Sequence, residues 1–220
     1  MIRKFSLFLI IGLCFYSYAY CVGPLLGSKH DLSEPSAGRS EVCVFCHTPH
    51  YSGNFPLWNK RLLTSDPAAM FVAYSSPTMD TEPTNPPNLT SLLCLSCHYY
   101  QSGLTGSVAH TILNAPGAGN PVYQPNCLRC HLGGGPLYHD ALKIGPNLRD
   151  DHPVSMKYPQ PSEDPDFNPP PDSEKGWSDV RLFSGYVECS SCHDPHNPTY
   201  RPFLVRSNAS SQLCFVCHKK

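Results

Sequence analysis

The stretch CVFCHTPH, which runs from Cys43 to His50, has two cysteines three positions apart, a histidine directly after the second, and another histidine three residues later. Its first half, C-x-x-C-H, occurs five times in the 220-residue chain, and we number these five frames in chain order. Their cysteine pairs are Cys43 and Cys46, Cys94 and Cys97, Cys127 and Cys130, Cys189 and Cys192, and Cys214 and Cys217. Their histidines are His47, His98, His131, His193 and His218.

The first 21 residues have the pattern of a secretory signal peptide. Two basic residues precede a mostly apolar run from Phe5 to Phe15, and small or weakly polar residues follow. The run is shorter than the ~20 apolar residues that a membrane-spanning helix needs. We therefore expect residues 1–21 to be removed and residues 22–220 to be exported. Because Cys14 and Cys21 fall in the removed part, every cysteine of the exported chain then lies in a frame.

Three kinds of chemistry use paired cysteines in an exported protein. Disulfides do not account for the histidine after every second cysteine. Zinc sites group cysteines in fours or add histidines at looser spacing, and five pairs do not divide into fours. Covalent c-type haem uses C-x-x-C-H as its attachment sequence: the two thiols bond to the porphyrin and the adjacent histidine binds its iron. We therefore predict five c-type haems, one on each frame.

Six further histidines are candidates for the second axial ligand of each iron. Methionine, the other common ligand, occurs after the first residue only at Met70, Met79 and Met156, in no repeated setting. We therefore predict bis-histidine ligation throughout, with one histidine surplus. His110 and His139 flank frame 3, and of these two we favour His139. The six candidates are His30, His50, His110, His139, His152 and His196.

His50 lies on the same side of the frame 1 porphyrin as His47, so we expect it to bind the iron of a different haem. CSSCHDPH at frame 4 repeats this arrangement and ends at His196. Each short peptide is then expected to fix one haem covalently and to supply a histidine ligand to the iron of the neighbouring haem.

An internal repeat divides the chain. KHDLS, CVFCHTPH and SLLCLSCH in the first part resemble DHPVS, CSSCHDPH and SQLCFVCH in the last part. We therefore expect one domain, residues 22–220, built from a two-haem module at 22–100, a one-haem insertion at 101–145 and a second two-haem module at 146–220. Each two-haem module is expected to supply its own axial ligands.

Composition argues against a regular layered core. The chain has 24 prolines and 15 glycines, which interrupt helices and strands, and its net charge of -1 gives no reason to expect a nucleic-acid partner. Burial of porphyrin surface replaces a side-chain core, at ~40 residues per haem. We predict mostly irregular coil with few short helices, at the frames and over Asp66–Tyr74. The proline-rich segment Tyr158–Gly176 is expected to wrap as ordered coil.

The stretches GSKHDLS, EVCVFCHTPH, LCLSCH, IGPNLRDDHPVS, ECSSCHDPHN and LCFVCHKK resemble the exported multihaem cytochromes that polymerise into extracellular nanowires, and the tetrahaem kind most closely. The likeness runs from about Gly27 to the C-terminus and departs at frame 3, which adds a haem. It implies stacked bis-histidine haems, little secondary structure, and a filament in which one iron takes a histidine from the next subunit.

These observations lead us to expect an electron carrier rather than an enzyme. A multihaem reductase needs an iron with an open face, often with lysine in place of the frame histidine, whereas all five frames end in histidine. We expect a filament of head-to-tail copies outside the cell, passing respiratory electrons to redox proteins or extracellular acceptors. A monomeric periplasmic shuttle is the alternative. His30, near the exported N-terminus, is expected to bridge to the next molecule; the alternative is ligation within its own module.

Overall fold

The computed structural model describes residues 25–31, 33, 42–47, 57–58, 71–98, 144 and 146–219. Within these ranges, the chain outside a few short helices and strands consists of coil, turns, bends and isolated bridges. The predicted fold class, mostly coil with few short helices, is therefore confirmed. No helix in these ranges is long and apolar enough to cross a membrane. The regular elements are η2 (Val42–Phe45), α3 (Leu89–His98), β1 (Met156–Lys157), β2 (Tyr186–Val187), α5 (Cys189–Cys192), η5 (Ala209–Ser211) and α6 (Cys214–Cys217).

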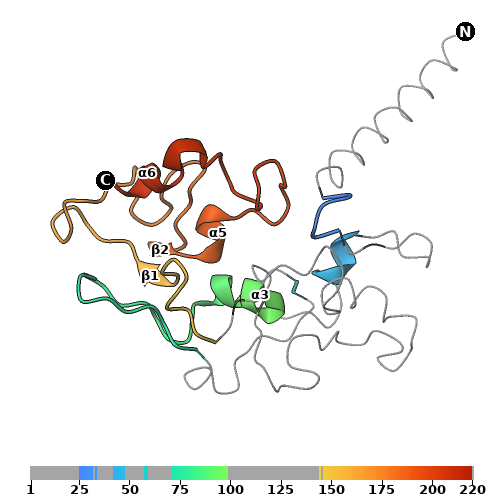
Figure 1. Cartoon of the computed structure of the whole chain (residues 1–220), viewed down its shortest axis with the longest axis horizontal. Coiled ribbons are helices and arrows are strands. Elements are labelled where there is room, and N and C mark those ends of the chain that lie inside the picture. The colour runs from blue at the N-terminus through green and yellow to red at the C-terminus, as the bar shows by residue number, and fades with distance from the viewer. Residues whose placement is uncertain are drawn as a thin grey trace, which may run out of the picture.

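Helix α3 carries frame 2 at its C-terminal end and lies centrally in the molecule (Figure 1). A proline pair precedes it and prevents the helix from extending further toward the N-terminus. Leu92 and Leu95, almost one turn apart, are buried and pack against Phe71 and Leu148. This small apolar cluster fixes the helix, and α3 in turn contacts α5, the helix of frame 4.

The helix expected over Asp66–Tyr74 is absent from its described part, residues 71–74. Val72 instead forms a parallel bridge with a distant segment: its N–H donates to the carbonyl of Pro146 at 2.6 Å, and its own carbonyl accepts from Leu148 N–H at 2.8 Å. Pairing with the segment before frame 4 has therefore prevailed over local helix propensity.

The only sheet among the described residues is a two-stranded antiparallel one, in which Met156 pairs with Val187. Strand β2 runs directly into α5 through Glu188, and Figure 1 shows β1, β2 and α5 next to one another. Tyr158, just after β1, is 2% exposed and packs with Leu182 and Val187 in a second apolar cluster. The sheet and this cluster support the start of frame 4.

The proline-rich segment Tyr158–Gly176 is ordered coil, as expected, and it wraps around frame 5. Asn168 is its main contact with α6: the backbone N–H donates to the carbonyl of Cys217 at 2.8 Å, and the side-chain amide donates to the carbonyl of Phe215 at 3.0 Å. The ring of Phe167 lies 4.5 Å from that of His218, centre to centre. The segment therefore holds the last frame in place.

Candidate haem sites

Frames 1, 4 and 5 share one local geometry, in which the frame histidine closes a single helical turn. Its backbone N–H donates to the carbonyl of the first cysteine, four residues earlier, as in an α-helix. The turn brings the two cysteines, three positions apart, to one side of the chain. This explains why the spacing C-x-x-C presents both sulfurs to one porphyrin edge. The N···O distances are 2.8 Å for His47 to Cys43, 3.0 Å for His193 to Cys189 and 2.9 Å for His218 to Cys214.

Two of these frame histidines, His193 and His218, leave their turns in an extended conformation. His193 has φ -117° and ψ 133°, and His218 has φ -98° and ψ 143°. All three histidines then form antiparallel bridges with other segments: His47 with Trp58, His193 with Leu204, and His218 with Phe167. The backbone of each candidate iron ligand is therefore held on both sides.

Three pairs of histidine rings share nearly the same separation, and each pair joins a frame histidine to one of the candidate second ligands. A metal–imidazole bond is about 2.0 Å long, so two imidazoles on opposite sides of one iron have ring centres roughly 6 Å apart. The described residues therefore fit a bis-histidine haem at frames 1, 2 and 5. The ring-centre distances are 6.1 Å for His47 and His196, 6.1 Å for His30 and His98, and 6.3 Å for His152 and His218.

Proline carbonyls orient three candidate ligand rings through Nδ1, two from these pairs and that of His193. A carbonyl only accepts, so Nδ1 must carry the proton, and the neutral ring is left with its lone pair on Nε2, ready for a metal. Fixing the ligand in this way is the usual role of the second hydrogen bond of a metal-binding histidine. The Nδ1···O distances are 2.8 Å for His193 to Pro202, 3.0 Å for His152 to Pro153 and 3.3 Å for His30 to Pro195.

Neighbouring side chains favour the neutral, ligand-competent form of two rings. His30 stacks on Phe203 at 4.3 Å between ring centres, and burial lowers the pKa of His30. Burial also lowers the pKa of His218. His196 is not buried in this way: its side chain is exposed, and its Nδ1 lies 3.7 Å from a carboxylate oxygen of Asp194.

Attachment cysteines of different frames lie next to one another. A hydrogen bond with the Cys94 thiol is the main cause of the lowered pKa of Cys189, which joins frame 2 to frame 4. Burial is the main cause that raises the pKa of Cys192 to about 11 and that of Cys217 to about 12, and the nearby Cys214 contributes to both. Frame 4 therefore lies between frames 2 and 5.

The two other uses of paired cysteines have no counterpart in the described part of the chain. None of the seven cysteines whose side chains are described there forms a disulfide. No group of three or more His, Cys, Asp or Glu in these ranges is placed to hold a metal ion such as zinc.

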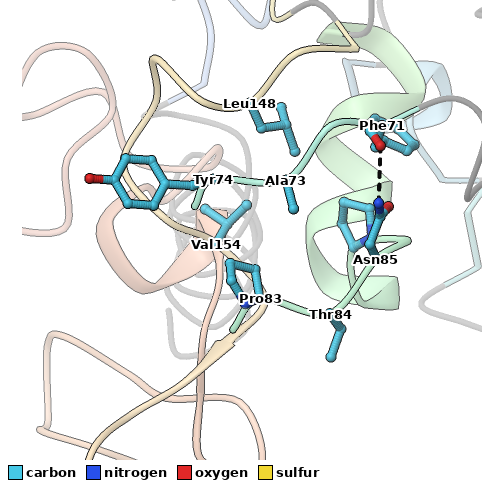
Figure 2. Close-up of a pocket in the computed structure, with 9 residues that line it drawn as sticks. Phe71, Ala73, Tyr74, Pro83, Thr84, Asn85, Leu148 and Val154 are labelled. Atoms are coloured by element: carbon cyan, nitrogen blue, oxygen red, sulfur yellow. Dashed lines mark hydrogen bonds between the residues drawn. The ribbon is translucent and has the colours of Figure 1, made fainter. Parts of the chain in front are cut away.

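A small pocket lies beside the first apolar cluster and is not a haem seat. Figure 2 shows Phe71, Leu148 and Val154 in its lining, with the hydroxyl of Tyr74 directed away. Asn85 Nδ2 donates to the carbonyl of Phe71 across it at 3.0 Å. The lining contains neither cysteine nor histidine, so the pocket offers no ligand to iron.

The ring contacts bear on two expectations about ligand pairing. His30 lies beside His98 of its own chain, as ligation within the first module would require, and the bridge to a second molecule stays a prediction. His47 of the first module faces His196 of the second, so this contact favours an exchange of ligands between the modules, and the self-sufficient modules stay a prediction.

Several predicted residues lie outside those described. They are residues 1–21, His50, His110, His139, and frame 3 with Cys127, Cys130 and His131. The side chain of Cys97 is also outside.

Sequence reasoning missed two kinds of residue that shape the sites. The first is the proline carbonyls described above: only Pro153 is adjacent in sequence to the histidine that it contacts, whereas Pro195 and Pro202 contact histidines elsewhere in the chain. The second is Glu188, directly before frame 4, which is 2% exposed. Nothing in the sequence indicated that this charged residue, between a strand and a frame, would be buried.

Comparison with known protein families supports haem binding at the C-terminal end of the chain. Residues 184–220, which contain frames 4 and 5, match the family model described as "Doubled CXXCH motif". No curated protein matches the chain. The match supports a multihaem c-type cytochrome-like protein that binds haem covalently and transfers electrons.

Proposed function

We propose that the protein carries electrons through five covalently bound, bis-histidine c-type haems. The observation that carries the proposal is the recurring ring separation of 6.1 to 6.3 Å in three histidine pairs from different parts of the chain. When bound, each haem supplies a one-electron couple, and the chain's own residues hold the irons six-coordinate and the porphyrin edges close together.

We assign the remaining ligands by the pattern of the sequence. His196 follows frame 4 and faces His47 of frame 1. His50 follows frame 1 at the same spacing, so it is the natural second ligand for His193 of frame 4. The exchange then becomes reciprocal, and His110 and His139 remain for frame 3, with His139 preferred.

An electron carrier is favoured over a reductase by the same pairs. A reductase needs an iron with an open coordination position for its substrate. In each of the three described pairs, the second histidine would fill the remaining axial position of a bound haem iron.

We further propose that the exported chain assembles head to tail into an extracellular filament, as the resemblance to nanowire cytochromes suggests. A contact of this kind does not close on itself and continues as a fibre. The alternative is a monomeric periplasmic shuttle. It would be supported if His30, which lies beside His98, serves frame 2 of its own chain, because no neighbour would then be needed to complete that frame. Redox partner proteins or extracellular acceptors take the electrons in either case.

Haem stoichiometry is the first test. Denaturing mass spectrometry of the mature chain is expected to show five haem additions and an N-terminus at Val22, because each frame holds one haem and Cys21 is removed with the signal peptide. A Cys127→Ala and Cys130→Ala double variant is the control and should show four. A wild-type count of four would remove frame 3 from the proposal.

The assembly state is the second test. Material sheared from intact producing cells is expected to contain filaments by cryo-electron microscopy, made of this chain by mass spectrometry. If the protein is found only as a monomer in the periplasmic fraction, the shuttle is correct and the filament is not.

A further inference from the structure

We propose that Glu188 is a buried anion that lowers the reduction potentials of the haems on frames 2 and 4. The proposal deepens the electron-transfer function and rests on haem being bound at both frames.

The carboxylate of Glu188 lies between the helices that carry these frames. Glu188 is 2% exposed and directly precedes α5, which contacts α3. Its Oε1 accepts a hydrogen bond from Asn88 Nδ2 at 2.8 Å. Its Oε2 accepts from Ser91 Oγ at 2.5 Å and from Ser155 Oγ at 2.9 Å. Ser91 and Ser155 are both fully buried, so this cluster is closed to water.

The hydrogen bonds around the cluster determine the direction of donation. Ser91 Oγ accepts the backbone N–H of Cys189 at 3.1 Å, and Ser155 Oγ accepts that of Asn88 at 2.8 Å. Each hydroxyl therefore gives its own proton to Glu188. The side-chain oxygen of Asn88 accepts from Thr84 Oγ1 at 3.1 Å, which turns its NH₂ group toward Glu188. All three partners donate, and a carboxyl group that only accepts is a carboxylate anion.

This negative charge has no cationic partner in the described part of the chain. The two ion pairs found there join His196 to Asp194 and Arg206 to Asp179, and no cationic nitrogen in the described ranges lies within 4.0 Å of Glu188. The charge of Glu188 acts on the neighbouring attachment site. A hydrogen bond with Cys94 is the largest influence on the pKa of the Cys189 thiol and lowers it, whereas the charge of Glu188 raises it.

A fixed anion near a haem favours the oxidised state. One electron from a donor converts Fe(III) to Fe(II) and removes one positive charge from the centre. The anion stabilises the more positive ferric form, so the haem accepts the electron at a lower potential. A unit charge at about 10 Å in protein shifts the ratio of reduced to oxidised haem by about tenfold. For a one-electron couple, this corresponds to about 59 mV.

The test uses the full-length haem-loaded protein with Glu188→Gln, which keeps the size of the side chain and removes its charge. Haem methyl signals in paramagnetic NMR follow each haem during a redox titration. At a fixed ambient potential, we expect the reduced-to-oxidised ratio of two haems to rise about tenfold and the others to change less. Glu188→Asp, which keeps the charge, should restore most of the shift. Glu174→Gln removes an exposed carboxylate and is the control.

A second variant tests the sign independently and replaces the first if Glu188→Gln does not fold. Ser155 has φ 57°, so Ser155→Gly relaxes the backbone while removing one donor from the anion. The less compensated charge is expected to lower the same two potentials. The proposal is overturned by unchanged potentials in a folded, low-spin Glu188→Gln protein, or by raised potentials in Ser155→Gly. Haem counts by mass spectrometry on the same samples separate either outcome from a failure of haem binding.

Discussion

Replacing His196 with alanine is expected to leave every haem attached and to open the iron of frame 1. Attachment depends on the frame cysteines, whereas His196 only faces His47 across a 6.1 Å gap between ring centres. The unliganded iron should become high-spin, and its reduced form should bind carbon monoxide, which the fully liganded protein does not. Optical and electron paramagnetic resonance spectra measure this change, at one haem per chain. His196→Met, which supplies a thioether ligand, should stay low-spin at a higher potential.

A double variant shows which haem has been opened. If His196 serves frame 1, adding Cys43→Ala and Cys46→Ala to His196→Ala removes the only haem that binds carbon monoxide, and the signal disappears. If the signal persists, His196 serves another frame and the exchange of ligands between modules is wrong.

Gly176→Ala is expected to cost about 3 kcal/mol or more of the free energy of unfolding. Gly176 has φ +73°, where an L-residue loses about 1–2 kcal/mol. An added Cβ would lie 2.7 Å from the backbone nitrogen of Leu182 and 2.8 Å from the carbonyl oxygen of Val180. Because both are backbone atoms, the loop must shift, and overpacking of this kind costs about 1–3 kcal/mol more. Chemical denaturation of the haem-loaded protein, followed by far-UV circular dichroism, measures the loss.

Two other glycines provide a graded control for this prediction. Gly185 has φ +80°, and its Cβ would meet only the carbonyl oxygen of Ser173 at 3.2 Å. Gly27 has φ +72° and nothing within 4 Å. The expected order of destabilisation on substitution by alanine is therefore Gly176, then Gly185, then Gly27. Equal losses at all three sites would mean that backbone conformation alone, and not the close contacts at Gly176, sets the cost.

Local features of these sites were predictable from the sequence because each is contained in five consecutive residues. The C-x-x-C-H spacing implies a single helical turn, which frames 1, 4 and 5 form with His47, His193 and His218 closing it. The lack of regular layers followed from proline and glycine, which act on their own neighbours. The coil over Tyr158–Gly176 was predictable for the same reason, because its prolines interrupt regular structure locally.

Pairing between distant residues was not predictable for the opposite reason. Which histidine faces His47 depends on how coil segments lie against each other, and no periodicity encodes that arrangement. The internal repeat suggested self-sufficient modules, whereas the contact of His196 with His47 favours an exchange of ligands between them. The prolines were interpreted only as interruptions, although three of them also supply rigid carbonyls to His30, His152 and His193. Burial of Glu188 likewise arises only when α3 and α5 meet.

The pairing of His47 with His196 has a consequence for the order of assembly. The proposed export would deliver the chain from its N-terminus, so frame 1 would reach its destination before the ligand proposed to complete it. Until almost the whole polypeptide had crossed, the first iron would remain open to small diatomic gases and to oxidative side reactions. A prematurely terminated product retains that hazard permanently. A chain must therefore be complete as far as His196 to close the first iron, as well as to form its structure. We expect truncated forms to be degraded rapidly by proteases.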